Sequence, residues 1–308
     1  FFFMKYVVTG GAGFIGSHIV DLLIINNHNV HVIDNFSSGK KDHCNSNAAY
    51  YELDISNLEN NGKLNDICNC ADGIFHVAAS VRVQDSIKRP LDFELNNTIG
   101  IVNMLNVAKN NNVKRLIYSS SSSIYGDTTK LPSKEDDPIF PISPYAMQKY
   151  YGEVCCKTYS KIYSLETASL RYFNVYGERQ SLDGAYPLVI SAFAKQRLEN
   201  KPLTIRGDGN QKRDFTHVSD IANANYLAMK SNNIGKGEVI NIGRSNSKSI
   251  NEVAEMMGGD KIFVDPVIEP KENLSDNNKA KKLLDWEPKI NIEDWIPNYK
   301  KQLGIIDE

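Results

Sequence analysis

The feature that most constrains the fold is a glycine-rich turn, Thr9-Gly-Gly-Ala-Gly-Phe-Ile-Gly16, near the start of the chain. The apolar run before it predicts a buried strand, and the apolar-periodic run Ser17 to Ile25 predicts a helix that begins beneath the turn. Glycines at such a turn let backbone amides approach a pyrophosphate, and the helix N-terminus stabilises its negative charge. A second predicted strand, residues 29–34, ends in Asp34. An acidic residue is expected about 20 residues after a dinucleotide-binding glycine turn, and Asp34 fits that position. An acid there accepts hydrogen bonds from a ribose 2′-hydroxyl and repels a 2′-phosphate, so the sequence favours NAD over NADP.

Strand-like and helix-like runs alternate through the first half of the chain. The predicted strands cover residues 49–53, 73–77, 113–118 and 166–171. This alternation predicts a parallel sheet with helices on both faces, a doubly wound α/β fold of the Rossmann type. After about residue 174, prolines separate shorter elements, which predicts a smaller, mixed α/β lobe. Ligands of such sheets bind beyond the carboxyl ends of the strands, where Asp34, Asp54, Ala78, Ala79, the serines from Ser119 and Asn174 are expected.

The segment Tyr145-Ala-Met-Gln-Lys149 predicts a proton-transfer pair, because positions four apart lie on one face of a helix. A free phenol has a pKa of about 10 and is a poor base at neutral pH. A nearby ammonium, together with a second positive charge such as an oxidised nicotinamide ring, lowers that pKa where the dielectric is reduced. Taken alone, a Tyr and a Lys at this spacing more often mean a core aromatic and a solvated amine. The predicted dinucleotide-binding turn upstream is what favours the catalytic interpretation of this pair.

Composition narrows the class of protein. The chain has 308 residues and a formal net charge of −2, with no basic run, which argues against nucleic acid as the main partner. No apolar stretch reaches the length of a bilayer span, so no membrane partner is expected. The five cysteines lack the paired spacing of a metal site. We therefore expect no metal site, and we expect reduced thiols in a cytoplasmic protein.

Five motifs occur in a characteristic order: the glycine turn, Ser119-Ser-Ser-Ser-Ser-Ile-Tyr-Gly126, Ser143-Pro-Tyr-Ala-Met-Gln-Lys149, Arg171-Tyr-Phe-Asn174 and Arg213-Asp-Phe-Thr-His-Val218. Together they resemble the extended short-chain dehydrogenase/reductase family, and within it the nucleotide-sugar 4-epimerases. The resemblance covers residues 4 to 300. The stretch Gly177 to Ile190 looks most like the UDP-N-acetylglucosamine 4-epimerase branch.

The resemblance implies a division of the chain. Residues 4–173 would form the NAD-binding Rossmann domain, joined by a returning segment near 214–243. Residues 174–213 and 244–308 would form the nucleotide-sugar-binding lobe. Relatives pair through the helices near 96–110 and 144–163, so a homodimer is expected. The apolar faces of these helices could equally pack against the sheet.

The resemblance also implies the site residues. Tyr145, Lys149 and Ser121 would be catalytic. The NAD site would comprise Gly10, Gly13, Phe14, Ile15, Gly16, Asp34, Asn35, Ser37, Ser38, Gly39, Asp54, Ile55, Val77, Ala78, Ala79, Asn96, Ser119, Tyr145, Lys149 and Phe173. The UDP-sugar would contact Arg82, Ser121, Asn174, Val189, Arg206, Arg213, Lys271 and Asn273.

The implied reaction is oxidation of the sugar at C4, rotation of the flat 4-keto sugar and reduction on its opposite face. Relatives that dehydrate carry an Asp-Glu pair after the Ser/Thr of the serine motif, and decarboxylating relatives place a Glu there. This chain has Ser122-Ser123, which favours epimerisation.

Two departures from the family pattern bear on the substrate. The usual Arg-Pro-Gly-Asp segment is absent, and Lys271 would replace its phosphate-binding Arg as a point charge. Asn273 would stand at the gate for the sugar 2-position. Arg82 occupies a place where many relatives have a small residue, so a UDP-glucuronate 4-epimerase or another nucleotide-sugar oxidoreductase is the alternative. A non-catalytic NAD(H)-sensing module is the alternative outside the enzymes.

Overall fold

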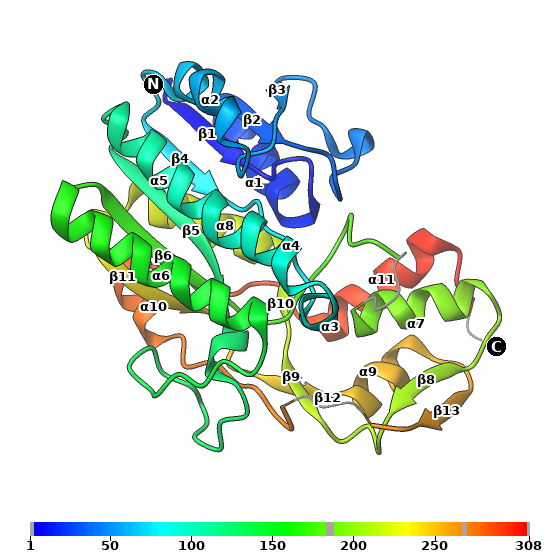
Figure 1. Ribbon diagram of the computed structural model, residues 1–308. Coiled ribbons are helices and arrows are strands. Elements are labelled where there is room, and N and C mark those ends of the chain that lie inside the picture. The colour runs from blue at the N-terminus through cyan, green and yellow to red at the C-terminus, as the bar shows by residue number, and fades with distance from the viewer. Residues whose placement is uncertain (1–2, 183–187, 267–269, 307–308) are drawn as a thin grey trace.

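The computed structural model describes residues 3–182, 188–266 and 270–306, and its main feature is a seven-stranded sheet (Figure 1). The strand order is β11-β6-β5-β4-β1-β2-β3, and every neighbouring pair is parallel. The strands are β1 (Lys5–Thr9), β2 (Asn29–Asp34), β3 (Ala49–Glu52), β4 (Gly73–His76), β5 (Arg115–Ser121), β6 (Glu166–Tyr172) and β11 (Lys236–Ile242). The order reverses between β1 and β4, where the crevice of a doubly wound sheet binds its ligand. The predicted fold class is confirmed.

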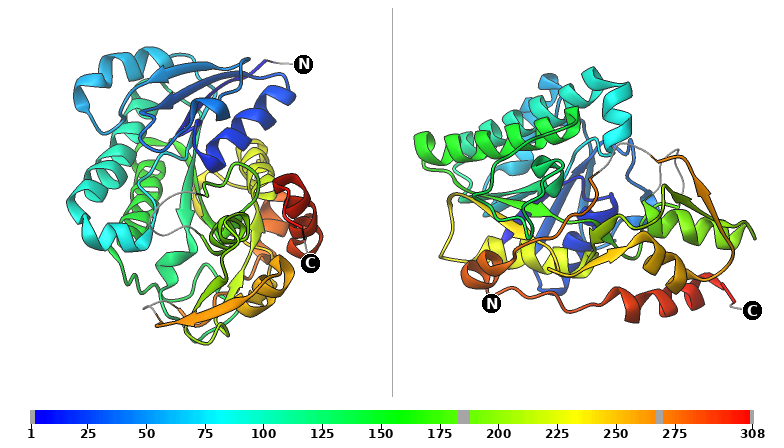
Figure 2. Two further views of the ribbon diagram at one scale, coloured as in Figure 1. Left: turned by 90° about the vertical axis from the view of Figure 1, so that its right-hand side faces the viewer. Right: turned by 90° about the horizontal axis from the view of Figure 1, so that it is seen from below.

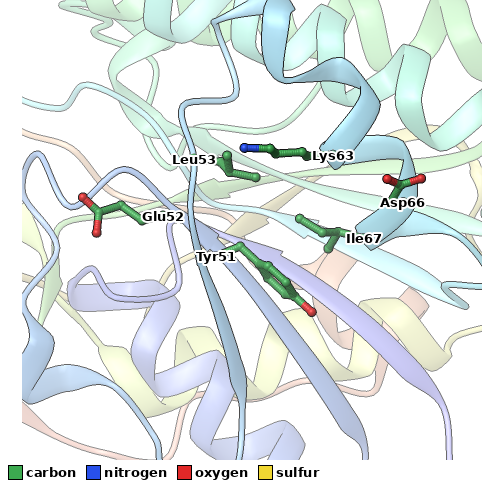
Figure 3. Close-up of a pocket in the computed structure, with 6 residues that line it drawn as sticks. All are labelled: Tyr51, Glu52, Leu53, Lys63, Asp66 and Ile67. Atoms are coloured by element: carbon green, nitrogen blue, oxygen red, sulfur yellow. The ribbon is translucent and has the colours of Figure 1, made fainter.

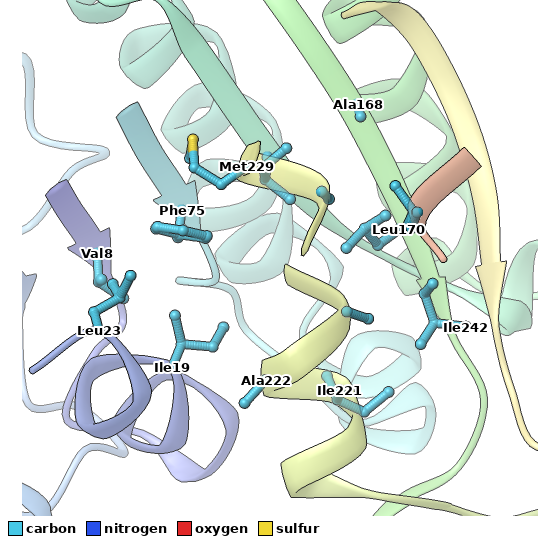
Figure 4. Close-up of a cluster of buried hydrophobic side chains, with 14 of the residues drawn as sticks. Val8, Ile19, Leu23, Phe75, Ala168, Leu170, Ile221, Ala222, Met229 and Ile242 are labelled. Carbon is cyan, nitrogen blue, oxygen red and sulfur yellow. The ribbon is translucent and has the colours of Figure 1, made fainter. Parts of the chain in front are cut away.

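Helices cover both faces of the sheet (Figure 2). One face carries α1 (Phe14–Ile25), α8 (Val218–Lys230) and α10 (Asn278–Leu284), and the other carries α2 (Asn61–Cys68), α5 (Gly100–Asn110) and α6 (Pro144–Tyr163). Under α1 and α8, the side chains of Val8, Ile19, Phe75, Leu170 and Ile221 form one buried cluster (Figure 4). A second cluster lies between the sheet and α2, α5 and α6. Because the sheet is buried on both faces, the central parts of β1, β2 and β5 are continuous apolar runs and not alternating patterns, except for His31 in β2.

Short elements join the strands to these helices. The connections contain η1 (Lys41–His43), η2 (Leu58–Asn60), α3 (Val83–Lys88), α4 (Pro90–Glu94), the π-helical turn η3 (Leu95–Ile99) and η4 (Ser122–Tyr125). The helix predicted at 96–110 therefore begins as a π-helical turn, a feature frequently found at functional sites.

The remaining elements form the smaller lobe, seen around α7 and α9 in Figure 1. They are β7 (Val175–Tyr176), α7 (Val189–Leu198), β8 (Leu203–Arg206), β9 (Lys212–Asp214), β10 (Thr216–His217), β12 (Ser247–Ser249), α9 (Ile250–Met257), β13 (Lys261–Val264) and α11 (Ile292–Leu303). Its strands pair two by two, and it has a core of its own that includes Phe193, Val253 and Ile296. The returning segment near 214–243 supplies α8 and β11 to the larger sheet. The division at residues 173/174 remains a prediction.

None of the helices in the described ranges is both long and apolar enough to cross a membrane.

Candidate active site

The glycine turn is packed too closely to admit side chains. A Cβ on Gly10, where φ is +71°, would lie 2.7 Å from the Ala78 nitrogen, and a Cβ on Gly16 would lie 2.1 Å from the Gly10 carbonyl oxygen. Gly13 begins α1, and among the described residues no side chain caps this end and no acid lies in its first turn. The first amides of α1, from Phe14 to Gly16, are therefore left for an external acceptor. An uncapped helix start beside a glycine-rich turn fits the pyrophosphate of NAD.

Asp34 joins the end of β2 to this turn. Its carboxylate accepts hydrogen bonds from the Ala12 amide at 2.9 Å and the Phe36 amide at 2.8 Å. The following loop, which carries Asn35, Ser37, Ser38 and Gly39, folds back so that the Lys40 amide donates to the Ala12 carbonyl at 3.0 Å. The predicted ribose acceptor thus lies beside the predicted pyrophosphate site.

A chain of polar contacts continues across the neighbouring strand ends. The Asn35 amide group donates to Asp54 at 3.1 Å, and the Ser56 hydroxyl donates to Asp54 at 2.6 Å and approaches Asn96 at 3.4 Å. Asn96 in turn donates to the Ser80 hydroxyl at 2.8 Å. Ile55, beside Asp54, is buried, and Val77, Ala78 and Ala79 follow β4 on the same rim. The structure therefore gathers this part of the predicted NAD site.

Two predicted cofactor residues are buried. Phe173 is fully buried with Ile124 and Tyr125, and the Ser119 hydroxyl is bonded to Tyr172 at 2.9 Å. The Ser119 carbonyl accepts a hydrogen bond from the Lys149 ammonium at 2.8 Å. Contact of these two residues with the cofactor remains a prediction.

The predicted catalytic residues meet at the start of α6. Ser121 ends β5 and is hydrogen-bonded to Tyr145. Lys149 lies one turn further along α6, where its ammonium donates to the Ser119 carbonyl at 2.8 Å and sits 5.8 Å from the centre of the Tyr145 ring. The sequence spacing therefore does bring the phenol, the hydroxyl and the ammonium together.

Burial shifts the proton affinities of both groups. It raises the pKa of the Tyr145 phenol, and the hydrogen bond with Ser121 opposes only part of that rise. Burial also lowers the pKa of Lys149 to about 7. Desolvation thus disfavours the charged form of both groups, which is consistent with the expectation that a second positive charge must act together with the ammonium to lower the pKa of Tyr145.

One residue that the sequence did not reveal, Ser86, fixes the start of α6. Ser143 caps the Ala146 amide and accepts from the Met147 amide, while Pro144 has none to donate. The Tyr145 amide donates to the Ser86 hydroxyl of α3 at 3.2 Å, and that hydroxyl donates to the Val83 carbonyl at 2.6 Å. No spacing rule pairs Ser86 with Tyr145, which lies 59 residues further along the chain, so sequence reasoning could not find this contact.

On the predicted substrate side, Asn174 and Asn273 are in direct contact. The Asn174 side chain donates to the Asn273 side chain at 2.9 Å, and Asn273 accepts from the Asp214 amide at 2.9 Å. The Asp214 carboxylate is fully buried and accepts from Ser275, Arg244 and Ser245. Asp214 therefore holds the segment with Asn273 against β9. The sequence reasoning had assigned Asp214 no role.

The predicted phosphate ligands lie on the same two adjacent segments. Arg213 is half-buried in β9, and exposed Lys271 runs beside that strand, where its carbonyl accepts from the Lys212 amide at 2.9 Å. Val189 begins α7 and Arg206 ends β8, so these two come from the smaller lobe. The family-like stretch 177–190 includes residues 183–187, which lie outside the described residues.

Arg82 stands at the start of α3, one turn before Ser86. Its backbone has φ of +90°, a left-handed conformation that is uncommon for a residue with a side chain. Its guanidinium lies 4.0 Å from the Asp85 carboxylate. The structure thus places Arg82 on the element that contacts the Tyr145 amide.

A separate pocket lies between β3 and α2 (Figure 3). It has a volume of about 370 Å³ and is lined by Tyr51, Glu52, Leu53, Lys63, Asp66 and Ile67. None of the predicted site residues lines this pocket.

The fold and the site define the class: a Rossmann-type enzyme with a dinucleotide turn and a Tyr, Lys and Ser relay at the strand ends. Residues 6–243 match the NAD dependent epimerase/dehydratase family, and the chain belongs to that family. Its cofactor is NAD, as predicted, and the prediction of an enzyme of the epimerase type is confirmed.

Three relatives indicate the range of substrates in this family. A candidate UDP-glucose 4-epimerase from Methanocaldococcus jannaschii is 37% identical over 297 residues, covering 94% of this chain and 95% of its own. A UDP-N-acetyl-α-D-glucosaminuronate decarboxylase from Bacillus cytotoxicus is 36% identical over 257 residues, covering 82% and 78%. The solved UDP-N-acetylglucosamine 4-epimerase of Methanobrevibacter ruminantium M1, in complex with UDP-N-acetylmuramic acid, has a TM-score of 0.89 and 35% identity, covering 98% and 96%.

Proposed function

We propose that this protein is an NAD-dependent 4-epimerase of a UDP-hexose. The preferred pair is UDP-N-acetylglucosamine and UDP-N-acetylgalactosamine, with UDP-glucose and UDP-galactose as a second pair. The observation that carries the proposal is the hydrogen-bonded pair of Ser121 and Tyr145 with the Lys149 ammonium behind it. This set suits removal and return of one hydroxyl proton.

The site residues have separate tasks in this proposal. Ser121 orients the 4-hydroxyl, and Tyr145 takes its proton and later returns it from the same position. NAD, when bound, supplies the redox chemistry at C4. Ser122 and Ser123 offer no carboxylate for a second acid or base, so elimination of water is disfavoured.

The substrate must be held by its diphosphate while the sugar stays free to turn. Arg213 can donate two parallel hydrogen bonds to a phosphate, and Lys271 on the adjacent segment adds a point charge. Asn174 and Asn273 lie beside them, tied to each other and to β9. Asn273 would form a fixed wall of moderate size at the sugar 2-position, which supports room for an N-acetyl group.

The alternative substrate is a UDP-uronic acid, and Arg82 is the observation in its favour. A guanidinium on the element that contacts Tyr145 suits a sugar carboxylate. Epimerisation of UDP-glucuronate is therefore the second candidate. A non-catalytic NAD(H)-sensing module finds no support, because Tyr145, Lys149 and Ser121 are all present and assembled.

Incubation of the purified protein, supplied with NAD, with each of UDP-N-acetylglucosamine, UDP-glucose and UDP-glucuronate separates these functions. We expect a mixture of C4 epimers from the first, a slower reaction with the second, and none with Tyr145→Phe. Epimerisation of UDP-glucuronate alone would establish the alternative. Release of a UDP-pentose would mean decarboxylation, and no change in any UDP-hexose with NAD bound would reject the epimerase proposal.

We also propose that the protein is a cytoplasmic homodimer. The face of α6 opposite Lys149 exposes Met147, Tyr151, Val154 and Ile162 at helical spacing. Leu91, Leu95 and Ile99 are exposed on the segment that leads into α5, which packs against α6. Apolar faces of this kind mark self-association. The cytoplasmic location is supported by five free cysteines, because the cytosol keeps thiols reduced.

Light scattering during gel filtration tests the dimer. Val154→Glu places a charge on the exposed face and should yield monomers, while Thr158→Ala on the same helix should remain dimeric. A monomeric wild-type protein at micromolar concentration would refute the dimer.

A further inference from the structure

The ammonium of Lys149 is held in an unusual setting for a charge. Lys149 is 4% exposed, and its ammonium donates one hydrogen bond to the Ser119 carbonyl. It also lies over two aromatic rings, 5.1 Å from the centre of Tyr118 and 5.8 Å from the centre of Tyr145. Both distances fall within the reach of a cation–π attraction, which is strongest where water is excluded.

The ring of Tyr118 has no freedom to move away from this ammonium. Tyr118 is 1% exposed in β5, and its hydroxyl end fills a notch at Gly152 of α6, where a Cβ would lie 2.3 Å from the phenol oxygen. His76 of β4 also stacks on the ring, with centres 5.8 Å apart and planes 19° apart. His76 is held in turn by the Thr9 hydroxyl at 3.0 Å.

These contacts form a continuous path from the glycine turn to the catalytic helix. Thr9 ends β1 at the turn, His76 ends β4, and Tyr118 contacts both His76 and Lys149. No residue in this path except Lys149 belongs to the predicted site. The residues along this path therefore have a role other than transfer of the substrate proton.

We propose that Tyr118 is a positioning residue whose ring face keeps Lys149 charged and aimed at Tyr145. Its relevance to turnover rests on the proposed function. The ring acts through Lys149 and touches neither the sugar nor the cofactor. Gly152 is glycine because a side chain there would push the ring out of this position.

The other groups around the ammonium cannot take over this role. Burial raises the pKa of Tyr118 well above its ordinary value, so this phenol stays neutral and acts through its ring alone. Burial lowers the pKa of His76 to about 3, so this imidazole is uncharged at neutral pH. The Glu153 carboxylate, further along α6, is engaged by Arg171 at 2.8 Å and by the Ser120 hydroxyl. Tyr145 supplies the second ring, but it is the group that reacts.

The test compares the titration of Lys149 in Tyr118→Phe, which keeps the ring, and Tyr118→Leu, which removes it. Phe75→Leu is the matched control, because Phe75 is fully buried on the adjacent strand in the other core cluster (Figure 4). The protein is labelled with ¹³C at the lysine ε-carbons and saturated with NAD, and Lys149→Met assigns the signal. Epimerase activity is measured over the same pH range.

We expect Tyr118→Leu to reduce the proton affinity of Lys149 about three- to tenfold, which moves its titration midpoint down by roughly half to one pH unit. Turnover should fall with it on the alkaline side, while Tyr118→Phe and Phe75→Leu keep the wild-type midpoint. An unchanged or raised midpoint in Tyr118→Leu, or an equal shift in Phe75→Leu, would overturn the proposal. A lowered midpoint in a protein that converts no UDP-sugar would support the role of Tyr118 and reject the proposed function instead.

Discussion

Replacing Gly16 by alanine tests whether the glycine turn is needed for its shape. The new Cβ would lie 2.1 Å from the Gly10 carbonyl oxygen and 2.9 Å from the Gly11 Cα. Ordinary van der Waals contact begins at 3.4 Å, so the helix start and the turn must move apart by about 1.3 Å. Both neighbours are backbone atoms of a tightly packed turn, and no side-chain rotation can relieve the overlap.

The displacement has two separate consequences. Overpacking of this kind costs about 1–3 kcal/mol of unfolding free energy. A shift of more than 1 Å also moves the first amides of α1 away from the pyrophosphate. Losing one hydrogen bond to a charged group costs about 1.5–3 kcal/mol, which weakens NAD binding roughly ten- to a hundredfold.

Gly62→Ala is the matched control. Gly62 lies near the start of α2, is exposed, and a Cβ there would meet nothing within 4 Å. Alanine in a helix is favoured over glycine by roughly 0.5–1 kcal/mol, so this variant should be slightly more stable and should bind NAD normally.

Urea unfolding and calorimetric titration with NAD separate the two consequences. Unfolding is measured without NAD and with saturating NAD, because a bound ligand adds its own stabilisation. We expect Gly16→Ala to lose stability in both conditions and to lose more with NAD present. Wild-type affinity for NAD in Gly16→Ala would refute the reasoning, because it would mean that the turn tolerates the displacement.

Two further predictions concern other parts of the chain. Ser86→Ala removes the acceptor of the Tyr145 amide, so we expect kcat to fall several-fold with KM unchanged and the unfolding free energy to fall by about 1 kcal/mol; an effect on KM alone would contradict this role. The His217 imidazole nitrogen lies 3.2 Å from the Glu178 carboxylate, and the Trp295 indole donates a hydrogen bond to it. These contacts hold the pKa of Glu178 at about 2, below its ordinary value of 4.5, so their stabilisation is complete above pH 4.5 and is lost as the pH falls toward 2. Glu178→Gln should therefore flatten the loss of stability on acidification, measured by urea unfolding near neutral pH and at about pH 3, and an unchanged slope would contradict the assignment.

The parts of the molecule that sequence could predict are those governed by local rules. The order of strands and helices follows from apolar periodicity, and the pairing of Tyr145 with Lys149 follows from helical spacing. Ser121 was assigned from the family resemblance. Ser86 and Asp214 could not be found in this way, because each is defined by a contact with a segment about 60 residues away. Periodicity also does not tell which side of a strand end faces a ligand, so it could not show that the Ser119 hydroxyl bonds Tyr172.

The balance of charge in the relay could not be read from spacing. Burial raises the pKa of Tyr145 and lowers that of Lys149 to about 7. Both shifts oppose a phenolate paired with an ammonium, so the second positive charge expected from the cofactor has to outweigh them. In the proposed function, a positive nicotinamide ring beside this pair would favour the phenolate, and Tyr145 would act as a base only with the oxidised cofactor in place. Such an arrangement would confine proton removal to the state of the enzyme in which the sugar can also be oxidised.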